Sequence, residues 1–406
     1  MEIVRFGSLY SIPTSNGVSR PSAVRGQGFH MINMGELFSY DIINEIPMER
    51  VLLSEKEQNK YLVKKGDLLF ARQSLVASGA GKCSIVNDII EPTTFESHLI
   101  RVRLDEKMCC SLYYYYLFKL PDNPIKAIIN QCAQAGIRGS ELQNIKVPFP
   151  SLYTQRTISS ILYAYDNLIE NNTRRIRLLE QMAENLYKEW FVRFRFPGHE
   201  NAEFENGLPR GWRIGRLYEY GRIETGKTPS MLKQEYYGGD HLFIKTPDMH
   251  GNMFVRETEE TLSDKGNLSQ PKKLLPIGSI MVSCIGSSGV GAVAINAKEG
   301  HTNQQINSII LSSKDNLEWL YFTCKALKPM IELYGATGAT MTNLSKGKFE
   351  RLKVVEPSFD LRKLFHIKTK SIFDEILKLD ENITILSRQR DLLLPRLMSG
   401  KLEVNV

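Results

Sequence analysis

The feature that most constrains this chain is an internal duplication with a period close to half its length. One set of residues recurs 208 positions later (from 7 to 215): Gly7, Leu9, Tyr10, Pro21 and Ser22 return as Gly215, Leu217, Tyr218, Pro229 and Ser230. Three further matches follow in the same order: Lys65–Phe70 with Ile277–Val282, the glycine-rich Ser78–Gly81 with Ser287–Gly291, and Asn144–Ser151 with Glu350–Ser358. Chance does not supply four matches in one order, so we interpret the chain as two diverged copies of one unit.

The first part of each copy consists of short apolar runs separated by polar residues. The runs LLFAR, CSIVN, HLIRVRL, SIMVSCI and INSIILS have the composition of strands, and Gly, Asn, Thr and Ser lie between them. This pattern predicts a mixed α/β (α+β) globular unit with several polar loops. The run of four tyrosines from Tyr113 to Tyr116 is expected to belong to the core.

The second part of each copy, after Pro150 and after Pro357, has apolar side chains at alternating spacings of three and four. This spacing is typical of a long helix with a coiled-coil seam. The predicted seam residues are Leu162, Tyr165, Ile169, Ile176, Leu179, Ile372, Ile376, Leu379, Ile383 and Leu386. The simplest partner for one seam is the other, so we expect two antiparallel helices and an approximate two-fold axis within one chain.

The expected organisation is a globular unit at 1–150, a helix at 151–196, a second globular unit at 197–357 and a second helix at 358–406. A helix of ~39 residues at ~1.5 Å per residue is roughly 58 Å long. Two surfaces held at a fixed distance and in inverted orientation suit a long, pseudo-palindromic ligand such as duplex DNA.

Charge and cysteine usage narrow the classes of function. The chain has 52 Lys and Arg against 45 Asp and Glu, and the net charge of +7 permits a phosphate-bearing partner without requiring one. None of the six cysteines forms a CxxC pair or a zinc-like spacing with histidine, so we expect reduced thiols and no metal site. No secretory signal is evident at the start, and the apolar run from Leu112 to Phe118 is far shorter than the ~20 residues of a membrane span. A cytoplasmic location is therefore expected.

One motif points to another class of function. Residues Gly221–Thr228 fit the P-loop pattern, which would make the chain a stand-alone nucleotide hydrolase. A working P-loop opens a sustained helix, whereas Pro229 follows at once here and Gly238-Gly239 ends any helix within about ten residues. The other copy has no lysine in register within residues 14–20. We favour a polar turn and keep the hydrolase as the alternative.

Other catalytic motifs are missing from the sequence. It contains no Asn-Pro-Pro-aromatic motif for adenine methylation, no glycine-rich methyl-donor fingerprint and no acidic cluster typical of a nuclease. We therefore expect a chain without catalytic residues. A purely structural coiled-coil protein is a third possibility, but it does not explain the paired polar loops.

The two helical regions resemble those of the specificity (S) subunits of type I restriction–modification systems. The resemblance is carried by PFPSLYTQRTISSILYAYDNLIENNTRRIRLLEQMAENLYKEWFVRF (148–194) and RQRDLLLPRLMSGKLEV (388–404). Leu208–Trp212 and Thr302–Asn307 add to it, as does the order globular unit, helix, globular unit, helix over essentially the whole chain. The helix starts depart from the family, because the PxxEQ form appears as Pro150–Gln155 in the first copy and is replaced by Asp360–Arg362 in the second.

The resemblance implies that the globular units are target recognition domains, each reading half of a bipartite sequence in double-stranded DNA. It implies that the helices set the spacer and dock two methyltransferase (M) subunits, and that restriction/translocase (R) subunits join through these. No cofactor is expected in this chain, because S-adenosylmethionine, ATP and Mg belong to the partner subunits. The helix faces outside the seam, with Tyr187, Phe191 and Phe194, are expected to contact the M subunits.

Candidate DNA-binding residues come from the polar loops, because Arg and Lys suit guanine, Asn and Gln suit adenine, and all of them bind phosphates. In the first unit they are Ser15, Asn16, Arg20, Arg25, Gln27, Arg72, Gln73, Ser74, Lys82, Gln134 and Arg138. In the second unit they are Lys227, Thr228, Ser283, Ser287, Ser288, Thr340, Thr342 and Asn343. The family-like stretch Asn303–Gln305 is expected to support the fold instead.

Overall fold

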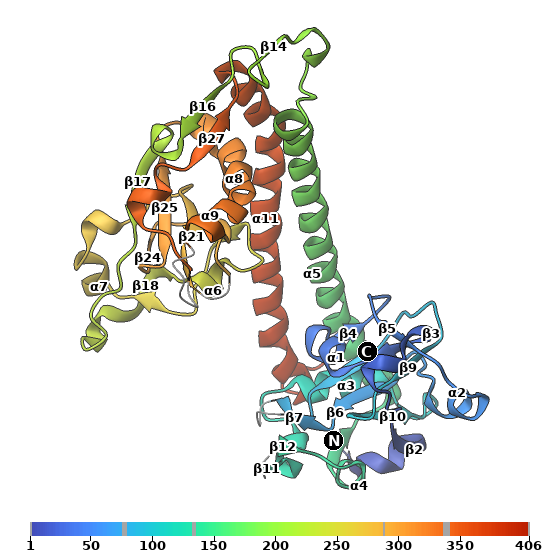
Figure 1. The fold of residues 1–406 in the computed structure, drawn as a ribbon. Coiled ribbons are helices and arrows are strands. Elements are labelled where there is room, and N and C mark those ends of the chain that lie inside the picture. Colours follow the sequence, from blue (N-terminus) through green and yellow to red (C-terminus); the bar gives the residue numbers. More distant parts are fainter. Residues whose placement is uncertain (1, 75–78, 132–134, 287–288, 336–341, 405–406) are drawn as a thin grey trace. The chain divides into compact units, whose positions relative to one another are not determined.

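The computed structural model describes residues 2–74, 79–131, 135–286, 289–335 and 342–404 (Figure 1). Its contacts divide the chain into two units, 1–170 with 384–406 and 171–383. Both long helices contribute residues to both units. Among the described residues, no helix is both long enough and apolar enough to span a membrane.

A five-stranded sheet forms the centre of the first unit (Figure 1). In spatial order its strands are β2 (Tyr10–Asn16), β10 (Leu99–Leu104), β6 (Leu68–Ala71), β8 (Cys83–Val86) and β4 (Ile42–Ile43). Neighbouring strands are antiparallel, except that β4 and β8 are parallel. Helix α3 (Ser111–Lys119) shares a core with this sheet, and its side chains from Tyr113 to Tyr116 are at most 2% exposed. The prediction that the tyrosine run belongs to the core is confirmed.

Smaller elements complete the first unit. One three-stranded sheet consists of β5 (Glu49–Val51), β3 (Arg25–Ile32) and β9 (Thr93–Phe95), and another consists of β11 (Asn130–Gln131), β12 (Ala135–Gly136) and β7 (Gln73–Ser74). The first and last strands, β1 (Glu2–Arg5) and β13 (Lys146–Phe149), pair with each other. The short helices are α1 (Met34–Ser39), α2 (Glu55–Tyr61) and α4 (Gly139–Leu142).

The second unit repeats this topology. Its five-stranded sheet has the order β17 (Gly221–Thr225), β25 (Ile306–Leu311), β21 (Ile280–Ser283), β23 (Val293–Asn296) and β19 (Phe254–Val255). The smaller sheets are β20 (Thr261–Leu262), β18 (Tyr237–Ile244) and β24 (Gly300–Thr302), then β22 (Ile285–Gly286) and β26 (Thr342–Asn343), then β16 (Arg213–Arg216) and β27 (Lys353–Glu356). The helices are α6 (Thr246–Met249), α7 (Asp264–Leu268), α8 (Leu317–Ala326), α9 (Lys328–Gly335) and α10 (Lys346–Phe349), and a hairpin of β14 (Phe204–Glu205) and β15 (Leu208–Pro209) precedes them. Matching strand orders confirm the predicted duplication and the mixed α/β class.

The strand register corrects the alignment at the start of the copies. Arg5 lies opposite the first residue of β13, and Arg216 lies opposite the first residue of β27. Arg5 therefore corresponds to Arg216, and the predicted match of Gly7 with Gly215 is three residues out of register. A few shared residue types align a short segment in several ways, whereas a hydrogen-bonded ladder allows one.

The long helices are α5 (Leu152–Tyr187) and α11 (Phe359–Met398), and a π-helical turn, Lys188–Val192, follows α5. They run antiparallel within each unit. Asp166 accepts a hydrogen bond from Arg390 at 2.7 Å in the first unit, and Glu375 accepts one from Arg175 at 2.7 Å in the second. All ten side chains predicted for the seam are buried or half-buried.

The P-loop-like segment contains a glycine that both copies need for packing. Strand β17 covers its first five residues, and irregular chain rather than a helix follows. A Cβ at Gly226 would lie 2.2 Å from the carbonyl oxygen of Asn303, and one at the corresponding Gly17 would lie 1.9 Å from that of Phe95. The residue after each glycine donates its N–H to an equivalent strand: Val18 to Phe95 of β9, and Lys227 to Thr302 of β24. Because the segment opens no helix, it lacks the phosphate cradle that the nucleotide-hydrolase alternative requires.

Substitution of Gly226 tests this interpretation. We expect Gly226→Ala to destabilise the second unit by at least ~2 kcal/mol, because the added methyl group overlaps a carbonyl oxygen of β24 or its continuation. Lys227→Ala, which would disable a P-loop, removes an exposed side chain and should change stability by less than ~0.5 kcal/mol. Thermal unfolding followed by circular dichroism measures both. A larger loss of stability in Lys227→Ala than in Gly226→Ala would contradict the packing role of Gly226.

Candidate functional site

Each five-stranded sheet has one end at which the polar loops gather. In the first unit, β2 and β6 end and β8 and β10 begin at the same end, because neighbouring strands are antiparallel. We call this end, together with the small sheet β11–β12–β7, loop edge 1. In the second unit, β17 and β21 end where β23 and β25 begin. That end, together with β22 and β26, is loop edge 2.

The opposite end of each sheet contacts a long helix. In the first unit, Asn87, which follows β8, donates a hydrogen bond from Nδ2 to the Tyr163 hydroxyl of α5 at 2.9 Å. In the second unit, Arg256, which follows β19, donates to Glu381 of α11 at 3.1 Å. Each loop edge therefore lies at the end of its sheet that is remote from these helix contacts.

The structure brings six predicted residues of the first unit to loop edge 1. They are Asn16, Arg72, Gln73, Ser74, Lys82 and Arg138. Gln73 and Ser74 form β7 and pair with β12, while Arg138 follows β12 and precedes helix α4. Arg20, Arg25 and Gln27 lie elsewhere, on β3 or just before it.

The predicted DNA-binding cations of the first unit differ in whether a carboxylate already pairs with them. Arg20 forms an ion pair with Glu57 at 2.6 Å, and Arg25 pairs with Glu49. Backbone hydrogen bonding from Ser54, together with Arg20, lowers the pKa of Glu57 to about 2, so this carboxylate is charged at neutral pH.

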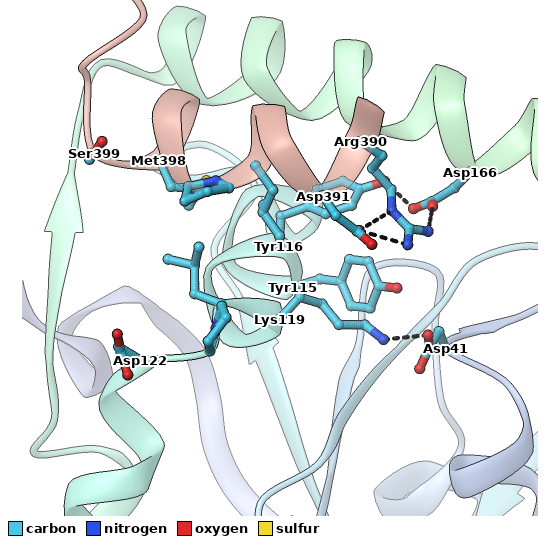
Figure 2. A pocket seen from close by; sticks show the side chains of 14 residues that line it. Asp41, Tyr115, Tyr116, Lys119, Asp122, Asp166, Arg390, Asp391, Met398 and Ser399 are labelled. Atoms are coloured by element: carbon cyan, nitrogen blue, oxygen red, sulfur yellow. Dashed lines mark hydrogen bonds and ion pairs between the residues drawn. The ribbon is translucent and has the colours of Figure 1, made fainter. Parts of the chain in front are cut away.

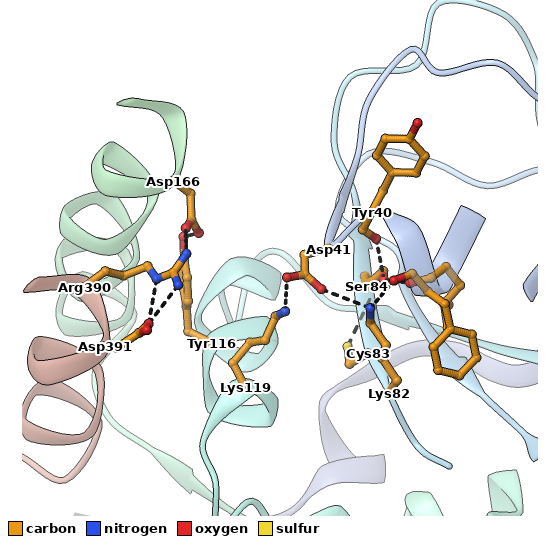
Figure 3. Close-up of polar contacts among 12 residues, drawn as sticks. Tyr40, Asp41, Lys82, Cys83, Ser84, Tyr116, Lys119, Asp166, Arg390 and Asp391 are labelled. Carbon is orange, nitrogen blue, oxygen red and sulfur yellow. Dashed lines mark hydrogen bonds and ion pairs between the residues drawn. The ribbon is translucent and has the colours of Figure 1, made fainter. Parts of the chain in front are cut away.

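Lys82 also has partners within its own unit. Its ammonium group donates to the Phe38 carbonyl at 2.7 Å and lies 3.4 Å from Asp41 (Figure 3). By contrast, neither Arg72 nor Arg138 forms an ion pair with any residue that the structure describes. Their guanidinium groups remain available for an anionic ligand.

Loop edge 2 carries fewer of the predicted residues. Lys227 and Asn343 are exposed, and Thr228 donates to the Gln304 side chain at 2.6 Å. We correct the prediction for Ser283, because its side chain is fully buried and lies 3.3 Å from the Thr246 hydroxyl, out of reach of a ligand.

Other predictions fall at or beyond the limits of the described residues. Gln134, Ser287, Ser288 and Thr340 lie outside them, and for Thr342 only the backbone, in β26, is described.

The expected docking role of Tyr187 and Phe191 is wrong. Both side chains are less than 9% exposed and belong to the core of the second unit. The ring of Tyr187 lies 5.5 Å from that of Phe322, and the ring of Phe191 lies 5.0 Å from that of Phe365. Phe194 is half-buried, with its ring 5.4 Å from that of Trp212. The globular part of the second unit thus covers the face of α5 that lies outside the seam.

An ionic network fastens the first unit to both helices (Figures 2 and 3). The Arg390 guanidinium donates to Asp166 of α5 at 2.7 Å and to Asp391 at 2.9 Å. The Tyr116 hydroxyl of α3 donates to the other Asp166 oxygen at 2.6 Å. Burial and the charge of Asp166 raise the pKa of Tyr116, so the phenol stays protonated and keeps donating. A cavity of about 680 Å³ borders this network, and Figure 2 shows the side chains that line it.

The departure from the family motif at the second helix start has a structural counterpart. Gln155 is fully buried; it accepts from the Cys110 N–H at 2.8 Å and donates to the Pro150 carbonyl at 2.9 Å. Arg362 occupies the corresponding place in the second copy, where it donates to Asn316 at 3.0 Å and pairs with Glu356 at 2.9 Å. Two different side chains tie the start of a helix to its unit.

The sequence motifs did not reveal one group of residues that could bind a metal ion. His30, Glu45 and Glu91 can bring one ligand atom each within 4.8 Å of one another. Their separations of 15 and 46 positions match no metal-binding spacing, and only the fold brings them together.

The comparisons with known proteins agree on one family. The Type I restriction modification DNA specificity domain matches residues 24–181 and 209–391. The chain is 29% identical to the type I restriction enzyme HindI specificity subunit of Haemophilus influenzae, over 85% of this chain and 88% of that protein. It is 26% identical to the MjaIX specificity subunit of Methanocaldococcus jannaschii, over 72% of this chain and 69% of that protein.

A solved structure has the same fold. The crystal structure of a type I restriction–modification system S subunit from M. genitalium matches with a TM-score of 0.62 and 13% identity, covering 98% of this chain and 95% of that one. The duplicated domains, the two helices and the match to the family over both copies lead to one conclusion: the chain belongs to the type I restriction–modification DNA specificity family, and it is a non-catalytic DNA specificity subunit.

Proposed function

We propose that each loop edge reads one half of a bipartite target in duplex DNA. The observation that carries this proposal is that one scaffold appears twice with different side chains at equivalent places. The carbonyls of Arg72 and Cys284 accept the same inter-strand hydrogen bond, yet only one of the two residues is a cation. The N–H groups of Val18 and Lys227 donate equivalent hydrogen bonds, and here the cation is in the second copy. Equivalent edges with different chemistry fit two different half-sequences.

The free cations at the edges set the expected chemistry of recognition. Arg72 and Arg138 at loop edge 1 suit guanine or phosphate, and Lys227 with Asn343 at loop edge 2 suits phosphate or adenine. Arg20, Arg25 and Lys82 act mainly within the first unit in this proposal, because each already pairs with a carboxylate there. The domain limits that fit this role are 1–150 and 197–357 for recognition and 151–196 and 358–406 for the helices.

The helices set the spacer and dock the methyltransferase subunits in this proposal. Helix α5 is continuous over 36 residues, which corresponds to a length of roughly 54 Å. Exposed apolar side chains replace Tyr187 and Phe191 as the docking candidates. They are Leu168, Ile385 and Leu392 in the first unit and Leu178, Met182 and Ile367 in the second.

The catalytic parts belong to partners in this proposal. Two M subunits bring S-adenosylmethionine, and R subunits bring ATP and Mg, so that methylation and cleavage occur where this chain directs them. Because its substrate is chromosomal DNA in this proposal, we expect the complex to act in the cytoplasm.

Replacing the free arginines tests the recognition role. We expect Arg72→Ala and Arg138→Ala to weaken binding of the assembled complex to its target by about 1–3 kcal/mol each if they contact bases. Single-molecule methylome sequencing should then show a relaxed base in one half-site, with the other half-site unchanged. Arg210→Ala is the matched control, since this exposed arginine lies beside the β14–β15 hairpin. Unchanged affinity and target in the Arg72/Arg138 double variant would refute their role.

Lengthening a helix tests the spacer role. Four residues inserted after Asn171 extend α5 by ~6 Å, close to two base pairs at ~3.4 Å each. We expect a longer spacer between unchanged half-sites in the methylome. The same insertion between Asn206 and Gly207, in the β14–β15 turn, is the control and should leave the spacer unchanged. If the α5 insertion methylates at the original spacing, the helices do not act as a ruler.

A further inference from the structure

A histidine and two glutamates converge in the first unit, at the ends of strands that the sequence separates. His30 lies on β3, Glu45 follows β4, and Glu91 precedes β9. The distance from His30 Nδ1 to Glu45 Oε1 is 3.9 Å, and that from His30 Nε2 to Glu91 Oε2 is 4.0 Å. Both distances are too long for hydrogen bonds, so the imidazole lies between two carboxylates without bonding to either.

The imidazole is buried, and one of its ring nitrogens has no partner. His30 is 8% exposed, and its Nδ1 has no hydrogen-bond partner among the described residues. A buried ring nitrogen without a partner costs free energy, and it calls for an explanation such as a bound ion. Glu45 and Glu91 are exposed, so their carboxylates can move toward a ligand while the histidine stays fixed.

The second copy shows that the fold does not require this histidine. The strand register matches His30 with Leu242, which is 5% exposed. An apolar side chain therefore fills the same place in the equivalent sheet. The histidine of this set therefore belongs to the first unit alone, and packing of the shared fold does not require it.

We propose that His30, Glu45 and Glu91 form a binding site for a divalent transition-metal ion of the Zn²⁺ or Mn²⁺ kind. One imidazole nitrogen and two carboxylate oxygens make a donor set that these ions accept. Ligands about 2.1 Å from one ion lie roughly 3 to 3.5 Å apart. One ligand atom from each of the three residues already lies within 4.8 Å of the others, so the glutamates need to close in by up to about 2 Å. Water completes the coordination on the exposed side.

Neighbouring groups already orient the two carboxylates. The Ile90 N–H donates to Glu45 Oε2 at 3.0 Å, which leaves Oε1 for the ion. Arg50 donates to Glu91 Oε1 at 3.0 Å and lies 2.8 Å from Oε2, so it competes with the ion for both oxygens. The site is therefore a moderate binder and not a permanent structural centre. Binding would join β3 to the chain segments after β4 and before β9. The ion therefore stabilises the first unit, and its role is independent of DNA recognition.

Metal titration of the untagged full-length chain tests the proposal. We expect isothermal titration calorimetry with ZnCl₂ to show one saturable site, and the melting temperature to rise by a few degrees in Zn²⁺ and return with EDTA. His30→Leu installs the side chain that the second copy uses, so it should fold normally and lose both effects. Glu45→Gln keeps an acceptor for the Ile90 N–H and should weaken binding at least tenfold.

Cobalt substitution identifies the donor atoms. Co²⁺ in the site should give visible absorption without a thiolate charge-transfer band. Such a band would report binding to a thiol, such as that of the half-exposed Cys110. Unchanged binding in both the His30→Leu and Glu45→Gln variants, a thiolate band in the natural chain, or no saturable binding of Zn²⁺ or Mn²⁺ at millimolar concentration would each overturn the proposal.

Discussion

The pairing of the first and last strands of each copy is the constraint on which the rest of the structure depends. Strands β1 and β13 pair in the first copy and β16 and β27 in the second, four residues with four. The long helix begins three residues after the second strand of each pair. Because the two ends of a copy meet at the start of its helix, the chain must return there, and the far end of the sheet is left for loops. Loops at that end can change without disturbing the helix.

The anchors between units and helices show what divergence preserved. Gln155 and Arg362 occupy the same place, yet one is neutral and the other forms an ion pair with Glu356. Helix α3 is tied to α5 by the Tyr116 hydroxyl, which donates to Asp166, and helix α8 is tied to α5 by Thr323, which lies 3.2 Å from the Tyr187 hydroxyl. What is common to both copies is that polar side chains hold each helix to its unit through hydrogen bonds or ion pairs, whereas the residues that form each pair have changed.

The duplication, the long helices and the tyrosine core could be predicted because each is a local or periodic signal. Other features depend on which surfaces meet. Helical periodicity grouped Tyr187 and Phe191 on a face outside the seam, but it could not show that the second unit covers this face. Ser283 was predicted in a loop, and the sheet buries it at the last position of β21. Gly226 fits a phosphate-binding pattern by composition, whereas the close approach of a neighbouring strand is what requires it.

The sequence by itself determined the architecture, since two copies of one pattern of strands and a seam-bearing helix allow few other folds. Repeats, turn residues and apolar spacing are encoded along the chain and can be read there. The tertiary structure alone decided which cations remain free, because Arg20, Arg25 and Lys82 meet carboxylates distant in sequence while Arg72 does not. It also decided that His30 lies between Glu45 and Glu91. Ion pairs and groups of ligand atoms form between residues that are distant in sequence. The register of the sheets decides which of these residues lie close together.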